Sequence, residues 1–434
     1  MRIESRISLL RAGLVLATVA LIACGPTVKP VTNPVVGACH TLSDCPATAS
    51  VCAATACSSG SCIYPGAATS CGAAGCVTGG SSYTPAGSCN GTGSCISGVT
   101  GSCPSGFVCG SGGGCVTVCM SDADCQTGFS CGGAGRCLKL LASGQSEPGS
   151  IAADSSFVYW IDTGGGGMVM KVSIEGGAIT TLASGQSSPY GIAVDSSFVY
   201  WGDEAIGTNS GTVMKVPIGG GAITTLASGQ SGPYTIAVDG SWVYWTDSGN
   251  SAGGTVMKVP VGGGAITTLA SGQSSPQGIA VDGSSVYWVD QGMSSVADGT
   301  VMSEPIGGGA ITTLASGQSG PQGIAVDGNS VYWVNGSGGT VMSVPIGGGA
   351  VTTLASGQSS PTGIAVDSSF VYWTDFVGQP NSGTVMKVPL LGGTSTTLAS
   401  GQNLPARISV NSSSVSWTNQ GIGSNGTVLQ LTPK

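Results

Sequence analysis

The stretch LASGQSGPYTIAVDGSWVYWTDSGNSAGGTVMKVPVGGGAITT, residues 226–268, is one of seven variants of a single pattern in this chain of 434 residues. By subtraction, copies of LASGQ or a close match begin 41, 44, 43, 45, 40 and 44 residues apart, at Leu141, Leu182, Leu226, Leu269, Leu314, Leu354 and Leu398. Each copy holds several short strand-like runs, and a unit of this size cannot bury its own faces without a neighbour. The period therefore predicts an all-β fold, a β-propeller whose blades stack around an axis.

Four strand-like runs, named a to d, divide each repeat; in the second repeat they cover 191–195, 198–202, 211–217 and 222–227. Run a is apolar throughout, as expected for a strand buried on both faces. Run d first appears alone at 138–143, six complete sets follow, and the last set ends with run c at 426–431. The two ends therefore complete one blade together. This predicts seven blades of four strands in a closed ring without open sheet edges.

The repeats resemble the YWTD repeat of the low-density-lipoprotein-receptor class B type and, more loosely, NHL repeats. The signature itself stands at 244–247 and 372–375. Three further copies vary at one position, Asn335 and Asn419 replace the Asp in two others, and Ser416 replaces the last Tyr. The resemblance covers about 138–434 and implies that the motif Asp ties neighbouring strands. Propellers of this family usually have six blades, so a six-bladed ring is the alternative to seven.

Two acidic series recur, one at the end of run a and one at the end of run b. A ring of carboxylates suggests a metal site, but carboxylates beside turns more often accept backbone N–H bonds. We therefore expect both series to be structural and no metal to be bound, with the repeated Trp and the Met of TVMKV packing in the core. The run-a series is Asp154, Asp195, Asp239, Asp282, Asp327 and Asp367, with Asn411 last.

The chain begins with three Arg residues and a short apolar run, which is typical of a secretory signal over 1–23. LIACG, ending at Cys24 and Gly25, resembles the bacterial lipobox, which implies cleavage before Cys24 and its lipidation. An ordinary signal with a stray thiol at Cys24 is the alternative. The Pro-containing segment 24–38 is expected to be an extended tether.

Sixteen of the 17 Cys lie between Cys39 and Cys137, and none lies in the repeats. A dense, even set in an exported chain predicts a disulfide domain at 39–137, with about eight bridges of undetermined pairing. This segment resembles cysteine-rich modules of secreted myxobacterial proteins. Zinc is disfavoured because no C-x2-C occurs and His40 is the single His. Asp122 and Asp124 are expected to cap turns, with Ca²⁺ binding as the alternative.

Composition excludes one class of partner. Charged residues make up 7% of the chain and the formal net charge is −8. Loss of residues 1–23 removes three Arg and one Glu, which leaves 9 basic and 19 acidic side chains. Because no basic stripe is present, nucleic acid is not an expected partner.

Ligand binding is expected where the repeats differ, because loops vary while a scaffold repeats. The d–a and b–c connections share one face of a propeller, and Tyr or Gln near the channel suits a sugar or peptide. The alternative is a solvated rim without a ligand. The candidate binding residues are Tyr190, Tyr234, Gln277, Gln322, Glu204, Asp298, Phe376 and Arg407.

Catalysis has weak support, because the repeats contain neither His nor Cys and seven-bladed bacterial lyases rely on His. Glu204, Asp298 and Glu304 remain as carboxylates, though no pattern brings them together. The sequence therefore favours a non-catalytic, lipid-anchored lipoprotein of the cell envelope, in the outer rather than the inner membrane. Its propeller would bind a glycan, peptide or protein without a cofactor. A carboxylate-dependent, carbohydrate-active enzyme and a purely structural surface protein are the alternatives.

Overall fold

A computed structural model of the chain describes residues 115–205, 209–250, 253–292 and 297–434, together with short segments between 56 and 109. Those segments are 56–58, 61–63, 70–71, 75–76, 82–84, 87–89, 95–96, 101–103 and 107–109. Cys24, the expected signal and the tether lie outside the described residues. The chain divides into two compact units, one comprising 1–75 and 83–101 and the other 76–82 and 102–434.

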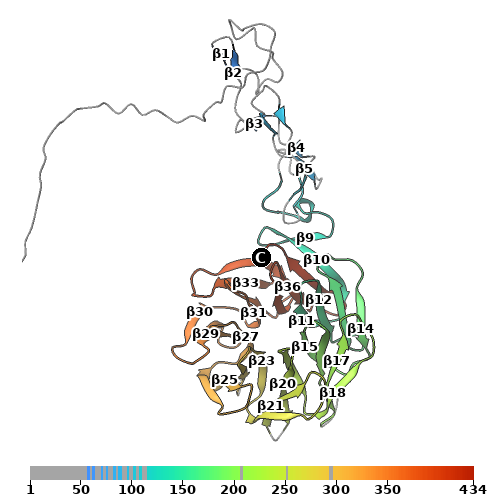
Figure 1. The fold of residues 1–434 in the computed structure, drawn as a ribbon, viewed down its shortest axis with the longest axis vertical. Helices are drawn as coiled ribbons and strands as arrows, with labels where there is room; N and C mark the ends of the chain where they lie inside the picture. Colours follow the sequence, from blue (N-terminus) through green and yellow to red (C-terminus); the bar gives the residue numbers. More distant parts are fainter. Residues whose placement is uncertain are drawn as a thin grey trace, which may run out of the picture. The chain divides into compact units, whose positions relative to one another are not determined.

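Seven four-stranded antiparallel blades form a closed ring, as the sequence predicts (Figure 1). The innermost strands are β11 (Pro148–Ala153), β15 (Pro189–Val194), β19 (Pro233–Val238), β23 (Pro276–Val281), β27 (Pro321–Val326), β31 (Pro361–Val366) and β35 (Pro405–Val410). The next strands outward are β12 (Phe157–Asp162), β16 (Phe198–Asp203), β20 (Trp242–Asn250), β24 (Ser285–Asp290), β28 (Ser330–Asn335), β32 (Phe370–Asp375) and β36 (Val415–Asn419).

The two outer strands complete each blade. The third strands are β13 (Met168–Ser173), β17 (Gly211–Pro217), β21 (Gly253–Pro260), β25 (Gly299–Pro305), β29 (Thr340–Pro345), β33 (Gly383–Pro389) and β37 (Gly426–Leu431). The outermost strands are β14 (Thr180–Ser184), β18 (Thr224–Gln230), β22 (Thr267–Gln273), β26 (Thr312–Gln318), β30 (Thr352–Ser356), β34 (Thr396–Gln402) and β10 (Arg136–Gln145). A turn between the third and fourth strands needs glycine, because Gly220 has a φ of +85°.

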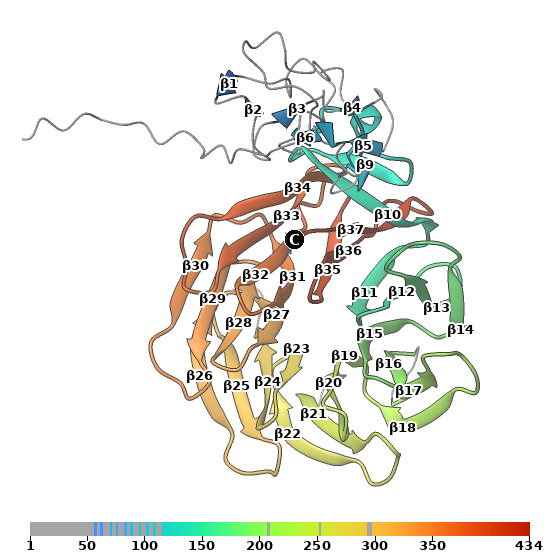
Figure 2. The same ribbon diagram turned by 45° about the horizontal axis from the view of Figure 1, so that its top comes forward.

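The ring closes through the two ends of the repeat region, which confirms the blade count. Strand β10 pairs antiparallel with β37, with Leu140 opposite Leu429 and Ser143 opposite Thr427 (Figure 2). The N-terminal strand therefore supplies the outermost edge of the seventh blade. Strand β10 is longer than expected, since it also pairs with β9 (Phe129–Gly132).

The core lies between adjacent blades and follows the alternation of side chains along the second strand. In β16, Trp201 packs with Tyr159 of the preceding blade. Its neighbour Tyr200 packs with Trp245 of the following blade. Because successive side chains on a strand point to opposite faces, the dipeptide Tyr-Trp packs against both neighbouring blades in six of the seven blades, and Ser416 replaces the Tyr in the seventh. The repeated Met also contacts this core, as predicted, with Met214 packed against the first of these clusters.

Described cysteines of this segment are cross-linked, as their dense and even set predicts. The described pairs are Cys103–Cys115, Cys119–Cys131 and Cys125–Cys137, each separated by 12 residues. Asp124 Oδ2 accepts the backbone N–H of Met120 and Ser121, so the expected turn-capping role is observed. These bonds hold the pKa of the exposed Asp124 carboxyl below its usual value.

Short strands also occur earlier in the chain: β1 (Ala56–Ser58), β2 (Ser61–Ile63), β3 (Ser70–Cys71), β4 (Gly75–Cys76), β5 (Ser82–Thr84), β6 (Gly87–Cys89), β7 (Cys95–Ile96) and β8 (Gly101–Ser102). They pair as β1–β2, β3–β6–β7 and β4–β5–β8. No helix in the described part of the chain is long and apolar enough to cross a membrane.

Candidate functional site

The innermost strands surround a narrow central channel with a volume of about 160 Å³. Its apolar ring is Ile151, Ile192, Ile236, Ile279, Ile324, Ile364 and Ile408. The residue that precedes this Ile is Gly, Ser or Thr in six blades. At one of these positions, a Cβ on Gly191 would lie only 2.7 Å from the Thr235 Cα. Close packing of neighbouring innermost strands therefore explains the small residues. Arg407 is the exception at this position.

Two tyrosines at the channel mouth lie side by side, as their equivalent places in adjacent blades predict. Their rings stack with centroids 4.2 Å apart and an interplanar angle of 21°. The hydroxyl oxygens of Tyr190 and Tyr234 are 2.8 Å apart, within hydrogen-bonding distance. This pair places an amphipathic aromatic surface beside the channel.

Arg407 completes this group from the seventh blade. Its Nη2 lies 3.4 Å from the Tyr190 hydroxyl, and its guanidinium carbon lies 6.0 Å from the Tyr190 ring centroid. The first blade stands between these two residues, and it carries Gly149 and Ser150 at the corresponding positions. Because these residues are small, Arg407 can reach across the first blade to Tyr190.

A pocket of about 210 Å³ lies in this place, at the entrance to the first blade. It is lined by Gly149, Ser150, Thr163, Ser188, Pro189, Tyr190, Ala406, Arg407 and Gln420. The two ion pairs of the described residues are Lys139–Glu175 and Lys434–Asp367, so neither involves Arg407. The guanidinium thus faces the pocket without a carboxylate partner.

Burial keeps the second tyrosine protonated. The pKa of Tyr234 is raised chiefly by burial and then by Tyr190, while Arg407 acts in the opposite direction. A protonated hydroxyl can donate a hydrogen bond. The group therefore combines two phenol hydroxyls with a guanidinium that has more N–H groups than its hydrogen bond to Tyr190 uses.

The other predicted residues are more scattered. Gln277 and Gln322 occupy the equivalent mouth positions, and Gln277 donates to the Ser275 hydroxyl at 3.3 Å. Glu204 and Asp298 are exposed, and Phe376 is half-buried. None of these five lines the pocket over the first blade. The structure therefore brings together Tyr190, Tyr234 and Arg407, and Glu204 lies close enough for its charge to contribute to the raised pKa of Tyr234.

Sequence reasoning missed several pocket residues, although a signal for two of them was present. Thr163 and Gln420 directly follow the second strand of their blades, at the position that Glu204 and Phe376 occupy elsewhere. Comparing the residue that follows the second strand across all seven repeats would have added Thr163 and Gln420 to the candidate residues. Ser150 and Ser188 carry no distinguishing pattern in a chain so rich in Ser.

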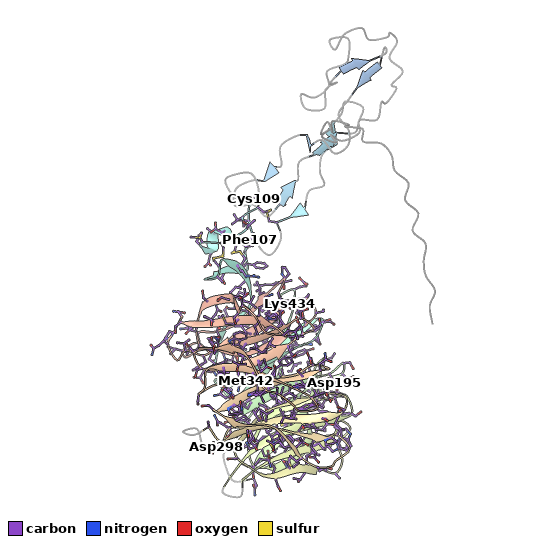
Figure 3. The ribbon with its side chains drawn as sticks, turned by 90° about the vertical axis from the view of Figure 1, so that its left-hand side faces the viewer. Phe107, Cys109, Asp195, Asp298, Met342 and Lys434 are labelled. Carbon is purple, nitrogen blue, oxygen red and sulfur yellow. A yellow bond between two sulfur atoms is a disulfide. The ribbon has the colours of Figure 1, made fainter. Side chains whose placement is uncertain are left out.

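The acidic series at the end of the innermost strands is structural, as predicted. Asp195 Oδ1 accepts the backbone N–H groups of Ser197 and Phe198, and Oδ2 accepts the Tyr200 hydroxyl at 2.7 Å. Figure 3 views the ring from the side and shows Asp195 and Asp298 at opposite faces. The Asp195 series is therefore on the face away from the pocket.

The second acidic series, at the end of the second strand of each blade, is buried and bonds to the segments that connect successive blades. Asp203 Oδ2 accepts the Ser187 N–H at 3.2 Å, within the segment entering its blade. The preceding Gln186 accepts the indole N–H of Trp201 at 3.0 Å. Burial raises the pKa of this carboxyl type to about 6 at Asp162, Asp247, Asp290 and Asp375.

Metal and carboxylate chemistry find little support in the described ranges. The one group of potential ligands close enough to hold a metal there is Cys119, Cys125 and Cys137, but these sulfurs are in disulfides. Glu304 is buried opposite Val286, near the start of its neighbouring strand, whereas Asp298 precedes the strand at the other end of the blade. Glu304 and Asp298 therefore lie at opposite ends of the same strand.

The geometry defines a seven-bladed β-propeller with a polar, aromatic pocket at one mouth of its channel. No model of a known protein family matches the sequence, and no curated protein matches it. Solved structures share the fold at low identity.

A streptogramin B lyase has a TM-score of 0.55 and 16% identity, and the match covers 68% of this chain and 97% of that one. A catalytically inactive variant of virginiamycin B lyase from Staphylococcus aureus, with quinupristin, also has a TM-score of 0.55 and 16% identity, over 68% and 98% of the chains. The computationally designed Ika8 protein has a TM-score of 0.50 and 18% identity, over 68% and 98%. These likenesses establish the fold alone.

Proposed function

We propose that this chain is a non-catalytic binding protein whose propeller holds a glycan, peptide or protein ligand at the channel mouth. The observation that carries the proposal is the assembly of Tyr190, Tyr234 and Arg407 beside a pocket of about 210 Å³. Binding sites typically combine aromatic surface with a few well-placed polar groups. Tyr and Arg are also the residue types that most often dominate binding energy.

The repeat supports the choice of this face. Residues that every blade needs, such as Asp195 and Trp201, make the bonds and contacts that hold the blades together. The pocket instead contains residues that depart from the repeat, since Gly149 and Arg407 differ from most residues at the same positions in the other blades. A scaffold with one irregular place suits recognition at that place.

Catalysis by paired carboxylates is the weaker proposal. Glu304 is buried at the opposite end of its blade from Asp298, and Glu204 is exposed in another blade. Acid–base hydrolysis needs two carboxyl groups close to one bond of the substrate. The lyase likenesses do not strengthen the enzyme proposal, because they rest on 16% identity.

We also propose that the protein is anchored to the cell envelope, with the outer membrane favoured, through lipid on Cys24. The lipobox-like LIACG motif supports this. Replacing Cys24 by Ser and fractionating cells tests it. We expect the variant to leave the membrane fraction; membrane binding as firm as that of the wild type would contradict the anchor.

An array of glycans and peptides probed with the wild type and with the double variant Tyr190→Ala/Tyr234→Ala tests the binding proposal. We expect a ligand that the double variant binds about 10- to 100-fold more weakly, since truncating central aromatic residues typically costs a few kcal/mol. The control is Tyr200→Phe, which removes a hydroxyl bond on the other face. A silent array, or equal binding by the double variant, would contradict the proposal.

A further inference from the structure

The basic residues of the propeller differ in what their charges contact. Strand lysines reach the next blade, as when Lys258 donates to the Ile306 carbonyl at 2.6 Å. Lys387 lies over the Phe370 ring, and Lys139 and Lys434 form ion pairs. Arg407 alone among them lines a pocket on the variable face and lies in neither ion pair.

Two departures from the repeat work together at this pocket. Arg407 stands where four other blades have Gly and two have Ser or Thr. Gly149 stands where the other blades have Tyr, Gln, Thr or Ala. A Cβ on Gly149 would meet nothing closer than 3.6 Å, and its φ is not positive, so the backbone does not require glycine there. The missing side chain leaves space in the pocket that Arg407 also lines.

The charged side chain that lines this space is a donor, beside neutral hydroxyl and amide groups of Ser150, Thr163, Ser188 and Gln420. The guanidinium carries five N–H groups and no acceptor. The Tyr190 hydroxyl accepts from Arg407 and lies 2.8 Å from the Tyr234 hydroxyl oxygen, so it already has partners on both sides and the guanidinium supplies the donors toward the pocket. Such an arrangement favours an acceptor-rich, negatively charged partner, because charge-assisted hydrogen bonds are the stronger ones.

Resting on the proposed function, we infer that the ligand is a saccharide carrying a single carboxylate, which Arg407 binds while the sugar ring lies against Tyr190. One cation matches one negative charge. The neutral hydroxyl and amide groups of Ser150, Thr163 and Gln420 match sugar hydroxyls. A polyanion is disfavoured, because the chain as a whole is acidic.

Calorimetric titration of the full chain with two trisaccharides, one ending in glucuronate and one in glucose, tests the inference. We expect the glucuronate sugar to bind at least about tenfold more tightly, as one charge-assisted hydrogen bond allows. Arg407→Gln should abolish this preference and Arg407→Lys should keep part of it. Gly149→Gln, the residue of two other blades, should weaken both sugars by filling the pocket.

The charge-matched control is Lys139→Gln, which removes a remote cation and should change nothing. Equal binding of the two sugars, no binding of either, or a preference that survives Arg407→Gln would overturn the inference. So would tighter binding of a phosphate-terminated counterpart, because a dianion would then be preferred. If the array yields a neutral ligand that depends on Tyr190 and Tyr234 but not on Arg407, the binding function stands and the acidic-sugar inference fails.

Discussion

Asn335 donates its side-chain amide to Gln318 Oε1 at 3.0 Å, in the place where five other blades bury an Asp. The same Gln318 oxygen also accepts the indole N–H of Trp333. An ionised Asp cannot make the Asn335 bond, because it has no proton to donate. One side-chain oxygen at this position is buried without a hydrogen-bond partner at Asp203, Asp247, Asp290, Asn335, Asp375 and Asn419, and in an ionised Asp that oxygen carries part of the negative charge.

The stability of the propeller should therefore fall as the pH rises from about 4 to 7. Burial raises the pKa of Asp162, Asp247, Asp290 and Asp375 to about 6, from a usual value near 4. The folded chain then binds more protons than the unfolded chain between these values, so its free energy of unfolding decreases through that window. Asp282 and Asp367, whose pKa values are lowered, should destabilise the fold only at still lower pH. Urea denaturation at several pH values measures this, and stability that rises from pH 4 to 7 would contradict it.

Asp247→Asn should stabilise the protein by about 3 kcal/mol at pH 8 and have little effect at pH 4, since one pKa unit corresponds to about 1.4 kcal/mol and burial raises the pKa of Asp247 from near 4 to about 6. The new amide can donate to Gln230 as Asn335 donates to Gln318. The reciprocal variant Asn335→Asp should lose a similar amount at pH 8. Denaturation of both variants at the two pH values decides this; a loss at pH 8 in Asp247→Asn would show that the carboxylate is needed.

Asp195→Ala should destabilise the fold by about 1–3 kcal/mol, because two backbone donors and the Tyr200 hydroxyl lose their acceptor. Glu147→Ala removes an exposed carboxylate and serves as the control, with an expected change below about 0.5 kcal/mol. Ligand binding by folded Asp195→Ala should match the wild type. Abolished binding in a fully folded variant would mean that the acidic series is itself a site.

Deleting 139–143 should lower the melting temperature and promote association. The deletion removes most of the pairing between β10 and β37 and exposes the edge of the seventh blade. Calorimetry and size-exclusion chromatography measure both effects, with Lys139→Gln as the control for loss of the exposed ion pair. An unchanged melting temperature with a monomeric profile would contradict closure through the chain ends.

The cysteine-rich residues should be sensitive to reducing agent, whereas the propeller core should not. A fragment of residues 138–434 contains no Cys and should keep its far-ultraviolet circular dichroism in reductant. In the full chain, reduction opens the Cys125–Cys137 bond, whose Cys137 lies in strand β10, so fraying of the first residues of β10 is expected while the blades remain. A large loss of β signal from the fragment on reduction would be incompatible with this.

The sequence predicts the parts of this structure that repeat. The spacing of LASGQ gives the blade count, and the dipeptide Tyr-Trp gives the two packing faces of the second strand. Even the stacking of Tyr190 on Tyr234 follows from equivalent positions in adjacent blades.

The sequence does not predict the contact between the seventh and second blades, which the closure of the ring brings together. Arg407 and Tyr190 are 217 residues apart, and they meet over a blade whose own residues are small. That relationship depends on the curvature of the ring and on which side chains are missing between them. No local pattern contains this information.

Hydrogen–deuterium exchange of the full chain, with and without the ligand selected on the array, tests the binding account most directly. If the ligand binds in the pocket over the first blade, exchange should slow at 148–150, 188–190 and 405–407, the segments of three blades that line it. Slower exchange confined to the opposite turns, such as 195–197 and 239–241, or no change at the channel mouth, would contradict it.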